Sequence, residues 1–304
     1  MRKIEGRSYV LILPRHAVAL VVDSPNSGVT YPVDFDYSCR LEELRSEECV
    51  HVEKLWSAAP SLGVPLLSAN VPRSYIDCSR SLVGIDFFGE GARRRAPVRQ
   101  ADIAKMRNRL VWRKLSNGAP IYSVKLSTVA VRRRIEAYYL PYHDALRKTI
   151  KMLRRKHGVV WHLSLHSVSA KEYERVGMVS TRLLADFVLG DCDGASCAPQ
   201  FTKIVSKFLR ELGYTVSINN PSNGTEIVAL YGRPRQKRHS LQVGVRRDLY
   251  MDEQTREPNA GFEQLRADLA LLTKLLVPAL SDLAKRLYGS KVSIKKTLEK
   301  IDDF

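Results

Sequence analysis

The chain has 304 residues, of which 44% are apolar, and it carries a formal net charge of +17 at pH 7. This length and apolar content suffice for a large packed core and argue against a disordered chain. No apolar run approaches the ~18 residues of a membrane span. An enzyme of small molecules does not need such an excess of positive charge. The charge therefore predicts a polyanionic partner, which is nucleic acid, an anionic membrane surface or an acidic protein.

The five cysteines are odd in number and form no CxxC pair. This usage indicates reduced thiols in an intracellular compartment rather than a disulfide framework. The N-terminal segment lacks a signal-peptide pattern, whereas Arg2, Lys3 and Arg7 are compatible with a remnant of organellar targeting. We therefore expect a reducing compartment inside the cell, with the mitochondrion favoured over the cytoplasm.

The first half of the chain predicts short strands with helices between them. β-like runs at 9–14 and 17–22 precede a loop at 23–32 that is dense in turn residues. Apolar spacing predicts a helix at 41–59, followed by Gly63, a strand at 64–69 and an extended segment at 71–80. A loop rich in glycine and arginine at 84–97 leads to a basic helix at 101–115.

The second half continues the alternation. Its predicted elements are a helix at 131–156 kinked or divided at Pro141, strands at 159–165, 214–218 and 240–245, and helices at 201–212 and 262–288, the last interrupted at Pro278. Strands that alternate with helices predict an α/β fold with a mostly parallel central sheet. We expect one domain over residues 1–288, with a basic insertion around 84–134 and a charged tail at 289–304.

His166 ends the predicted strand at 159–165, which reads as a strand buried on both faces. Ligands of such sheets gather at the carboxyl ends of the strands, so His166 is a candidate site residue. The alternative is a histidine that closes the strand and bonds only to backbone.

Several segments, in this order along 17–253, resemble the N-formylglutamate amidohydrolase family. SPNSG resembles its P-H-[SA]-G loop, VHVEKLW after Cys49 resembles D-W-H-V-D-x-L-Y, and RSYIDCSR resembles R-x-V-I-D-L-N-R. The segments PYHDAL, LHS, DFVLGDCDGASC and the loop at 219–224 also have family counterparts. LQVGVRRDLYMDE resembles L-Q-[IL]-E-[IL]-N-R-x-L-Y-M. The ordered set is more specific than any one piece.

The resemblance implies a zinc-carboxypeptidase-like, three-layer α/β/α fold and metal-assisted cleavage of a formyl amide. A catalytic zinc takes three His or carboxylate ligands and lowers the pKa of a bound water, and a nearby carboxylate moves the proton of that water. The family fills these roles with the His of P-H-[SA]-G, the acid of D-W-H, the His of the H-S strand end and the Glu of L-Q-[IL]-E.

This chain departs from the family at those positions. Asn26, Cys49 and Gly244 replace the first His, the acid and the Glu, and only His166 remains. Ser164 also stands where many relatives have an acidic residue. The residues that match the family's substrate-binding framework are Arg73, Asp77, Arg80 and Arg247. We therefore expect no catalytic residue, a degenerate base position at Gly244, remnants of a metal site at Asn26, Cys49 and His166, and no cofactor.

Two other readings stay open. A rebuilt zinc site on Cys49 and His166, with Glu47, Glu48 or His51 turned toward it, would make the chain a zinc-dependent amidohydrolase of N-formyl-L-glutamate or a related N-acyl amino acid. Alternatively, the retained arginines and Asp77 could hold an acidic metabolite without cleaving it.

The basic residues fall in clusters. Any one cluster would usually be a solvated helix face, but several clusters together are harder to explain in that way. Arginine forks suit phosphates, so we expect RNA contacts. The predicted RNA-binding residues are Arg93, Arg94, Arg95, Arg132, Arg133, Arg134, Arg154, Arg155, Lys156, Arg235, Lys237 and Arg238. Tyr138, Tyr139 and Tyr142 could stack bases, although their helical spacing favours core. The sequence thus predicts a catalytically silent, basic subunit of an RNA-containing assembly, with a mitochondrial ribosome or its assembly intermediate as the expected particle, and with ribosomal RNA and neighbouring proteins as partners.

Overall fold

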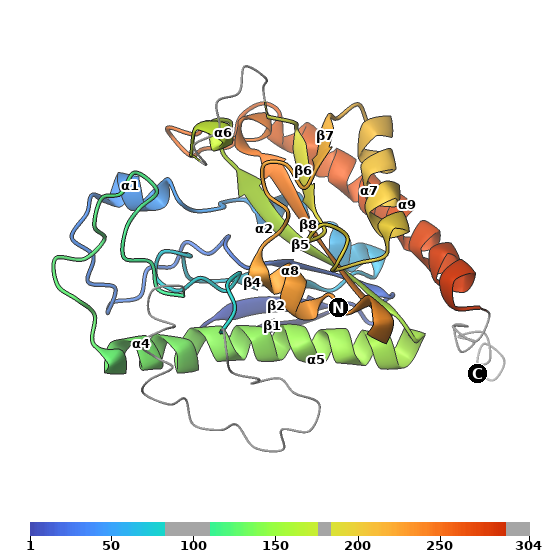
Figure 1. Cartoon of the computed structure of the whole chain (residues 1–304), viewed down its shortest axis with the longest axis horizontal. Coiled ribbons are helices and arrows are strands. Elements are labelled where there is room, and N and C mark those ends of the chain that lie inside the picture. The colour runs from blue at the N-terminus through green and yellow to red at the C-terminus, as the bar shows by residue number, and fades with distance from the viewer. Residues whose placement is uncertain (83–109, 176–183, 290–304) are drawn as a thin grey trace.

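A computed structural model describes residues 1–82, 110–175 and 184–289, and an eight-stranded sheet runs through it (Figure 1). The strands are β1 (Arg2–Glu5), β2 (Tyr9–Leu13), β3 (Leu20–Ser24), β4 (Leu66–Ala69), β5 (Val160–Val168), β6 (Phe187–Gly190), β7 (Val216–Ile218) and β8 (Arg238–Arg246). Their order across the sheet is β1-β2-β4-β3-β5-β8-β6-β7. The pairs β3–β4, β3–β5, β5–β8 and β6–β7 are parallel, and the pairs β1–β2, β2–β4 and β6–β8 are antiparallel. The predicted α/β class with a mostly parallel sheet is confirmed.

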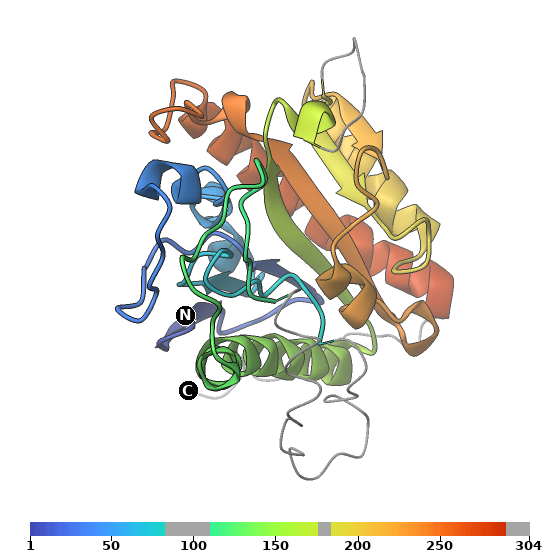
Figure 2. The same cartoon turned by 60° about the vertical axis from the view of Figure 1, so that its left-hand side comes forward.

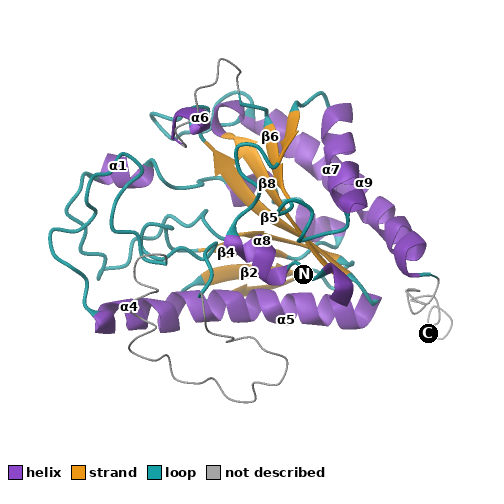
Figure 3. Ribbon diagram, in the orientation of Figure 1, coloured by secondary structure: helices purple, strands orange, loops and turns teal. Residues whose placement is uncertain are grey.

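Helices cover both faces of this sheet (Figures 1 and 2). They are α1 (Leu41–Arg45), α2 (Val52–Leu55), α4 (Thr128–Arg134), α5 (Leu140–His157), α6 (Glu172–Arg175), α7 (Pro199–Glu211), α8 (Glu226–Tyr231) and α9 (Phe262–Tyr288). The long helix α5 packs against β2, β3, β4 and β5, whereas α9 packs with α2 and α7 on the opposite side. Figure 3 shows the resulting three layers, with strands between two sets of helices.

The two faces of the central strands differ in character, because successive side chains of a strand point to opposite faces. In β5, Trp161, Leu163 and Leu165 join the apolar core beneath α9. Val160 joins the separate core beneath α5, which places His162, Ser164 and His166 on that same face. The site residues of β5 therefore lie on the α5 side of the sheet.

The predicted helix at 41–59 is wrong as a single element. The segment contains α1, then α2, then the 3-10 turn η1 (Ala59–Leu62). His51 has a left-handed backbone with φ of 65°, which a continuous helix does not allow. The break lets the chain turn at Cys49, whose backbone N–H donates to the carbonyl of Asn26 at 3.1 Å.

The predicted division at Pro141 takes another form. A π-helical turn, η2 (Ile135–Tyr139), joins α4 to α5, and Pro141 lies in the first turn of α5. The backbone stays right-handed helical on both sides of the turn, and the altered hydrogen-bond pattern of the π-turn directly precedes the proline, which has no N–H to donate. Pro278 lies inside α9, which continues through it.

The predicted insertion and tail fall largely outside the structure that can be described. Residues 84–109 and 290–304 are not among the described residues, and Arg93, Arg94 and Arg95 lie with them. Among the helices of the described residues, none has the length and apolar character that a bilayer crossing needs.

Candidate active site

The structure brings Asn26, Cys49 and His166 together at the carboxyl ends of the central strands. Asn26 follows β3, Cys49 lies in the turn between α1 and α2, and His166 lies near the end of β5. Cys49 has no exposed surface and His166 is 5% exposed. The side-chain amide of Asn26 lies 3.5 Å from Nδ1 of His166, and the backbone N–H of Cys49 donates to the carbonyl of Asn26 at 3.1 Å. Three segments distant in the sequence thus form one polar cluster.

The amide of Asn26 has one orientation that suits its neighbours. With its nitrogen facing Oδ1 of Asp77 at 3.1 Å and the carbonyl of Pro25 at 3.0 Å, that nitrogen donates to both. The amide oxygen then faces Nδ1 of His166 and can accept its proton in a hydrogen bond. Asn26 therefore helps to fix the ring of His166.

Cys49 has an unusual electrostatic environment. Burial alone would raise the pKa of its thiol, but the hydrogen bond from His166 and the positive charges of Arg73 and Arg247 lower this pKa to about 5. The Sγ atom lies 3.6 Å from the carbonyl of Ser167. These charges favour the thiolate, which is the reactive form of cysteine.

Arg73 is held by Asp77 and by an indole ring. Its Nη2 lies 3.3 Å from Oδ2 of Asp77, and its guanidinium lies 4.4 Å from the ring centre of Trp112. Asp77 is fully buried, which would raise its pKa, but Arg73 and two hydrogen bonds from Ser79 hold the pKa below its usual value. The Nε atom of Arg73 is buried and has no partner among the described residues. One N–H of this cation thus remains for a bound anion.

Arg80 and Arg247 complete the predicted substrate framework in different ways. Arg80 reaches Asp77 at 3.8 Å and Glu226 at 3.5 Å, and its side chain is about half exposed. Arg247 is buried, and its Nε donates to the hydroxyl of Ser167 at 3.1 Å. Arg247 also lines a pocket of about 320 Å³ that is bordered by Glu47, Ser116 and Glu253 among others. Arg247 therefore connects the cluster to the surface.

Behind His166 lies a row of buried polar side chains that sequence reasoning missed apart from Ser164. This polar row consists of Asp23, His162, Ser164 and Ser240. Oδ1 of Asp23 lies 2.8 Å from Nε2 of His162, whose Nδ1 lies 2.7 Å from the hydroxyl of Ser240. The hydroxyl of Ser164 lies 3.3 Å from Nε2 of His166. Alternation of polar and apolar residues along WHLSLH could have revealed this row.

The order Ser240, His162, Asp23 has the connectivity of a nucleophilic triad, but its setting is structural. All three residues are at most 1% exposed in the middle of the sheet. Burial would raise the pKa of Asp23, yet the pKa is lowered by His162 and by hydrogen bonds from His162 and from Tyr142 of α5. The hydroxyl of Tyr142 donates to Asp23 at 2.7 Å. The polar row therefore fastens α5 to the sheet and supports His166 from behind.

Gly244 occupies the position directly beside His166 in the β5–β8 ladder. A Cβ atom built there would meet Val168 and the carbonyl of Val188 at 3.4 Å, which is ordinary contact. A side chain would thus be accommodated, but this chain places no carboxyl group there. Thr225, whose hydroxyl lies 3.4 Å from Nε2 of His166, is the nearby group that sequence reasoning did not single out.

The donors of the cluster can be compared with the three-ligand zinc site that the family resemblance implies. Asn26 offers an amide, which is a poor zinc ligand beside the usual Cys, His and carboxylate donors. Glu47 accepts hydrogen bonds from the N–H and hydroxyl of Ser116, and Glu48 pairs with Arg256. His51 reaches the backbone of Arg256 at 3.0 Å. In residues 1–82, 110–175 and 184–289, no three His, Cys, Asp or Glu side chains are grouped to hold an ion. These residues do not fit such a site.

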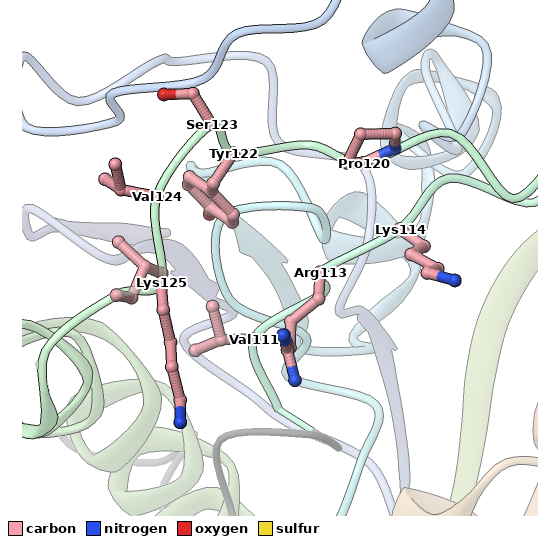
Figure 4. Close-up of a pocket in the computed structure, with 9 residues that line it drawn as sticks. Val111, Arg113, Lys114, Pro120, Tyr122, Ser123, Val124 and Lys125 are labelled. Carbon is pink, nitrogen blue, oxygen red and sulfur yellow. The ribbon is translucent and has the colours of Figure 1, made fainter.

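A separate pocket of about 390 Å³ lies in the segment 111–126 (Figure 4). It is lined by Arg113, Lys114 and Lys125 together with Val111, Pro120 and Tyr122. It shares no residue with the cluster and contains neither a thiol nor an imidazole. We therefore place the candidate site at Cys49 and His166 rather than here.

Comparisons with known proteins identify the family to which the whole chain is similar. The family model described as N-formylglutamate amidohydrolase matches residues 18–251. The chain is 25% identical over 281 residues to N-formylglutamate deformylase from Pseudomonas putida, covering 91% of this chain and 93% of that protein.

Two solved structures are similar over most of their length. The crystal structure of N-formylglutamate amidohydrolase from Ralstonia eutropha JMP134 is 43% identical, with a TM-score of 0.79, and the match covers 92% of this chain and 99% of that one. A gene product of Agrobacterium tumefaciens is 16% identical with a TM-score of 0.60, over 91% of this chain and 96% of that one, and shows the shared fold alone.

The predicted role as a basic subunit of a mitochondrial ribosome is wrong, as is the prediction of RNA and ribosomal proteins as partners. The family model, the Pseudomonas putida protein and the Ralstonia eutropha structure are all named for enzymes of N-formylglutamate, which points to an amidohydrolase rather than to a ribosomal subunit. Some of the predicted RNA-binding residues are also buried or paired inside the protein. Arg134 is 1% exposed, with its guanidinium 4.0 Å from the ring centre of Tyr75, and Arg133 pairs with Asp34. Tyr138, Tyr139 and Tyr142 are buried and cannot stack on bases.

The positions of the remaining basic residues do not restore that prediction. Arg132, Arg155, Lys156 and Arg235 are exposed on the surface, and Arg154, Lys237 and Arg238 are half-buried. Their exposure is the ordinary state of charged side chains. The fold, the ordered motifs and the two similar enzymes all point the same way, and the chain belongs to the N-formylglutamate amidohydrolase family.

Proposed function

We propose that this chain is an amidohydrolase that cleaves the amide of N-formyl-L-glutamate or of a related N-acyl amino acid. The observation that carries the proposal is the buried pair of Cys49 and His166 between two arginines, Arg73 and Arg247. The 43% identity to an N-formylglutamate amidohydrolase over 92% of the chain supports the same substrate class.

The arginines suit a substrate that carries carboxylates. A guanidinium binds a carboxylate through two parallel hydrogen bonds, which fixes both position and orientation. Arg73 has a buried N–H that meets no partner in the part of the chain that the structure describes, and Arg247 lies at the wall of the 320 Å³ pocket. An N-acyl glutamate has two carboxylates, so each could meet one arginine while the amide approaches the cluster.

His166 is the group of the cluster that can move a proton. Asn26 faces its Nδ1, while Ser164 and Thr225 lie near its Nε2. A histidine held on both sides keeps one ring orientation, which favours proton transfer to a leaving amine. The low exposure of the cluster excludes bulk water, which strengthens these electrostatic contacts.

The test is hydrolysis by the purified full chain, measured as formate and free amino acid released. We expect faster release from N-formyl-L-glutamate than from N-formyl-L-glutamine, because the latter lacks one carboxylate. His166→Ala should abolish release, whereas the matched variant His16→Ala, at an exposed position remote from the cluster, should keep it. A folded protein that released nothing from the N-formyl and N-acetyl derivatives of glutamate, aspartate and glutamine would overturn the proposal.

A further inference from the structure

We propose that Cys49 is the nucleophile of this hydrolase and that His166 carries its proton, in place of the metal-bound water that the family resemblance implies. The inference rests on the proposed amidohydrolase function and adds a covalent route to it. It follows from a disagreement. Asn26, Cys49 and Gly244 do not supply the ligands and the carboxylate base of a zinc site, whereas Cys49, His166 and Asn26 supply a thiol, an imidazole and an amide.

The geometry of that arrangement is the first support. The backbone N–H of Cys49 donates to the carbonyl of Asn26 at 3.1 Å, and the amide of Asn26 faces Nδ1 of His166 at 3.5 Å. The Sγ atom of Cys49 lies beside the backbone of Ser167, the residue that follows His166. A nucleophile, a base in contact with it and a third group that orients the base form the general pattern of nucleophilic catalysis. Asn26 is itself fixed by Asp77 and by the carbonyl of Pro25.

Comparison with the other buried cysteines is the second support. Cys78 and Cys197 are as deeply buried as Cys49. Burial raises the pKa of the Cys78 thiol, and it raises the pKa of the Cys197 thiol to about 12. The main charges that act on Cys78 are Asp77 and Asp23, and Asp191 acts on Cys197, whereas Arg73 and Arg247 act on Cys49. The chain therefore singles out one of its buried thiols for activation.

The third support is a series of contacts that joins the pocket to the thiol. Arg247 lines the pocket and its Nε donates to the hydroxyl of Ser167, while the thiol of Cys49 lies 3.6 Å from the carbonyl of that serine. The thiol itself has no exposed surface. The acyl group must therefore enter from the pocket as Arg247 turns toward a carboxylate of the substrate.

The reaction then balances without a further reactant except water. The thiolate attacks the acyl carbon and forms an S–C bond, and the oxyanion is met by the Nε–H of Arg73, which has no other partner among residues 1–82, 110–175 and 184–289. The C–N bond breaks as His166 gives its proton to the nitrogen, which releases the amino acid and leaves an S-acyl cysteine. His166 next takes a proton from water, the hydroxide attacks the thioester, and the S–C bond breaks. The acid departs, and the thiolate and imidazolium return.

The experiment is to trap the acyl group on the full chain. p-Nitrophenyl acetate is added, the reaction is quenched in acid, and the acylated peptide is identified by mass spectrometry. We expect one acetyl group on Cys49 and a matching burst of nitrophenolate. Cys49→Ser and Cys49→Ala should lose the adduct and at least roughly a thousandfold of turnover of N-formyl-L-glutamate. Cys197→Ala, a matched change of a buried thiol, should keep both.

The outcomes separate the inference from the function on which it rests. Turnover by the wild type that survives in a folded Cys49→Ala variant, or that is lost on dialysis against a chelator and restored by zinc, overturns the nucleophile and leaves the hydrolase standing. Acetylation confined to Cys49 without turnover of any N-acyl amino acid supports the nucleophile and overturns the proposed substrate class. Acetylation of Cys197 or of other residues while Cys49 stays unmodified also overturns the nucleophile.

Discussion

At the scale of single residues, Arg246 and Arg247 show how neighbours in a chain take different tasks. Arg246 pairs with Asp186 at 3.1 Å and with Asp248 at 2.6 Å. Arg247 turns the other way, to Ser167 and to the carbonyl of Ser46 at 2.9 Å. The pair therefore offers a matched test, because only Arg247 lies against the pocket and the thiol.

We expect Arg247→Lys to raise the KM for N-formyl-L-glutamate roughly tenfold or more, since one lost charge-assisted hydrogen bond is worth about 1.5–3 kcal/mol. Lysine keeps the charge but cannot form a forked contact, so kcat should change less than KM. Steady-state kinetics check this, with Arg246→Lys as the control at an unchanged KM. Equal effects of the two substitutions would contradict the role of Arg247.

The departures from the family at Asn26, Cys49 and Gly244 could be predicted from the sequence, because neighbouring motif residues fix each position. Their meaning could not. The charges acting on Cys49 come from Arg73 and Arg247, which lie 24 and 198 positions away in the chain, and only the fold brings them together. For the same reason the sequence indicated only that metal ligands and a base are missing. The structure adds that two arginines act on the thiol of Cys49.

At the scale of elements, the loop after β3 depends on a close approach of two backbone segments. A Cβ atom on Gly28 would lie 2.3 Å from the backbone carbon of Asn70 and 2.4 Å from the nitrogen of Val71. Backbone atoms cannot yield as the end of a flexible side chain can. The glycine of the SPNSG motif is therefore what allows the loop that carries Asn26 to lie against the end of β4.

We expect Gly28→Ala to lower the free energy of unfolding by about 1–3 kcal/mol or more, as overpacking does, and to reduce activity because Asn26 shifts. Gly6→Ala is the control, since its Cβ would meet nothing closer than 3.8 Å. Denaturant melts of both variants measure the difference. A Gly28→Ala protein as stable as the wild type would mean that the two segments can separate at little cost.

Strand positions were easier to predict than strand limits and helix continuity. The run at 159–165 corresponds to β5 and the run at 64–69 to β4. β3 begins later than predicted and includes Asp23 and Ser24, because polar residues are accommodated in its buried end by His162 and Tyr142. β1 was missed, since its charged sequence RKIE has little apolar pattern, as is typical of an edge strand.

At the scale of the whole molecule, buried neutral histidines link stability to pH. His143 of α5 is fully buried, with Nε2 3.0 Å from the carbonyl of Cys78 and Nδ1 3.0 Å from the hydroxyl of Tyr231 at the end of α8. Burial lowers its pKa to about 4 from an ordinary value of 6.5. The unfolded chain therefore takes up a proton at a pH where the folded chain does not.

The free energy of unfolding is therefore highest above pH 6.5, where His143 is neutral in both the folded and the unfolded chain. It falls as the pH drops from 6.5 toward 4, at about 1.4 kcal/mol per unit of pH and by up to about 3 kcal/mol for this residue. Denaturant unfolding measured between pH 7 and pH 4 should show that decline. His143→Gln should show a shallower one, because glutamine does not titrate. Parallel curves for the two proteins would mean that His143 is not the group responsible.

The net charge of +17 misled the functional prediction because a total charge does not say where charges lie or what they do. Asp77 accepts a contact from Arg73 inside the protein, and Arg134 holds a cluster of aromatic rings. Net charge is a legitimate argument about solubility and encounter, but the chemistry belongs to a few residues inside the fold.

The π-helical turn at Ile135–Tyr139 has a consequence for how the chain tolerates changes of length. Such a turn holds one residue more than an α-helical turn, so α4 and α5 differ in phase by about 100° from an unbroken helix. Deleting one residue there would give a regular helix but would remove the rotation between α4 and α5. Arg134 and Tyr142 could then no longer face Tyr75 and Asp23 at once, and a shorter, more regular sequence would make a poorer protein.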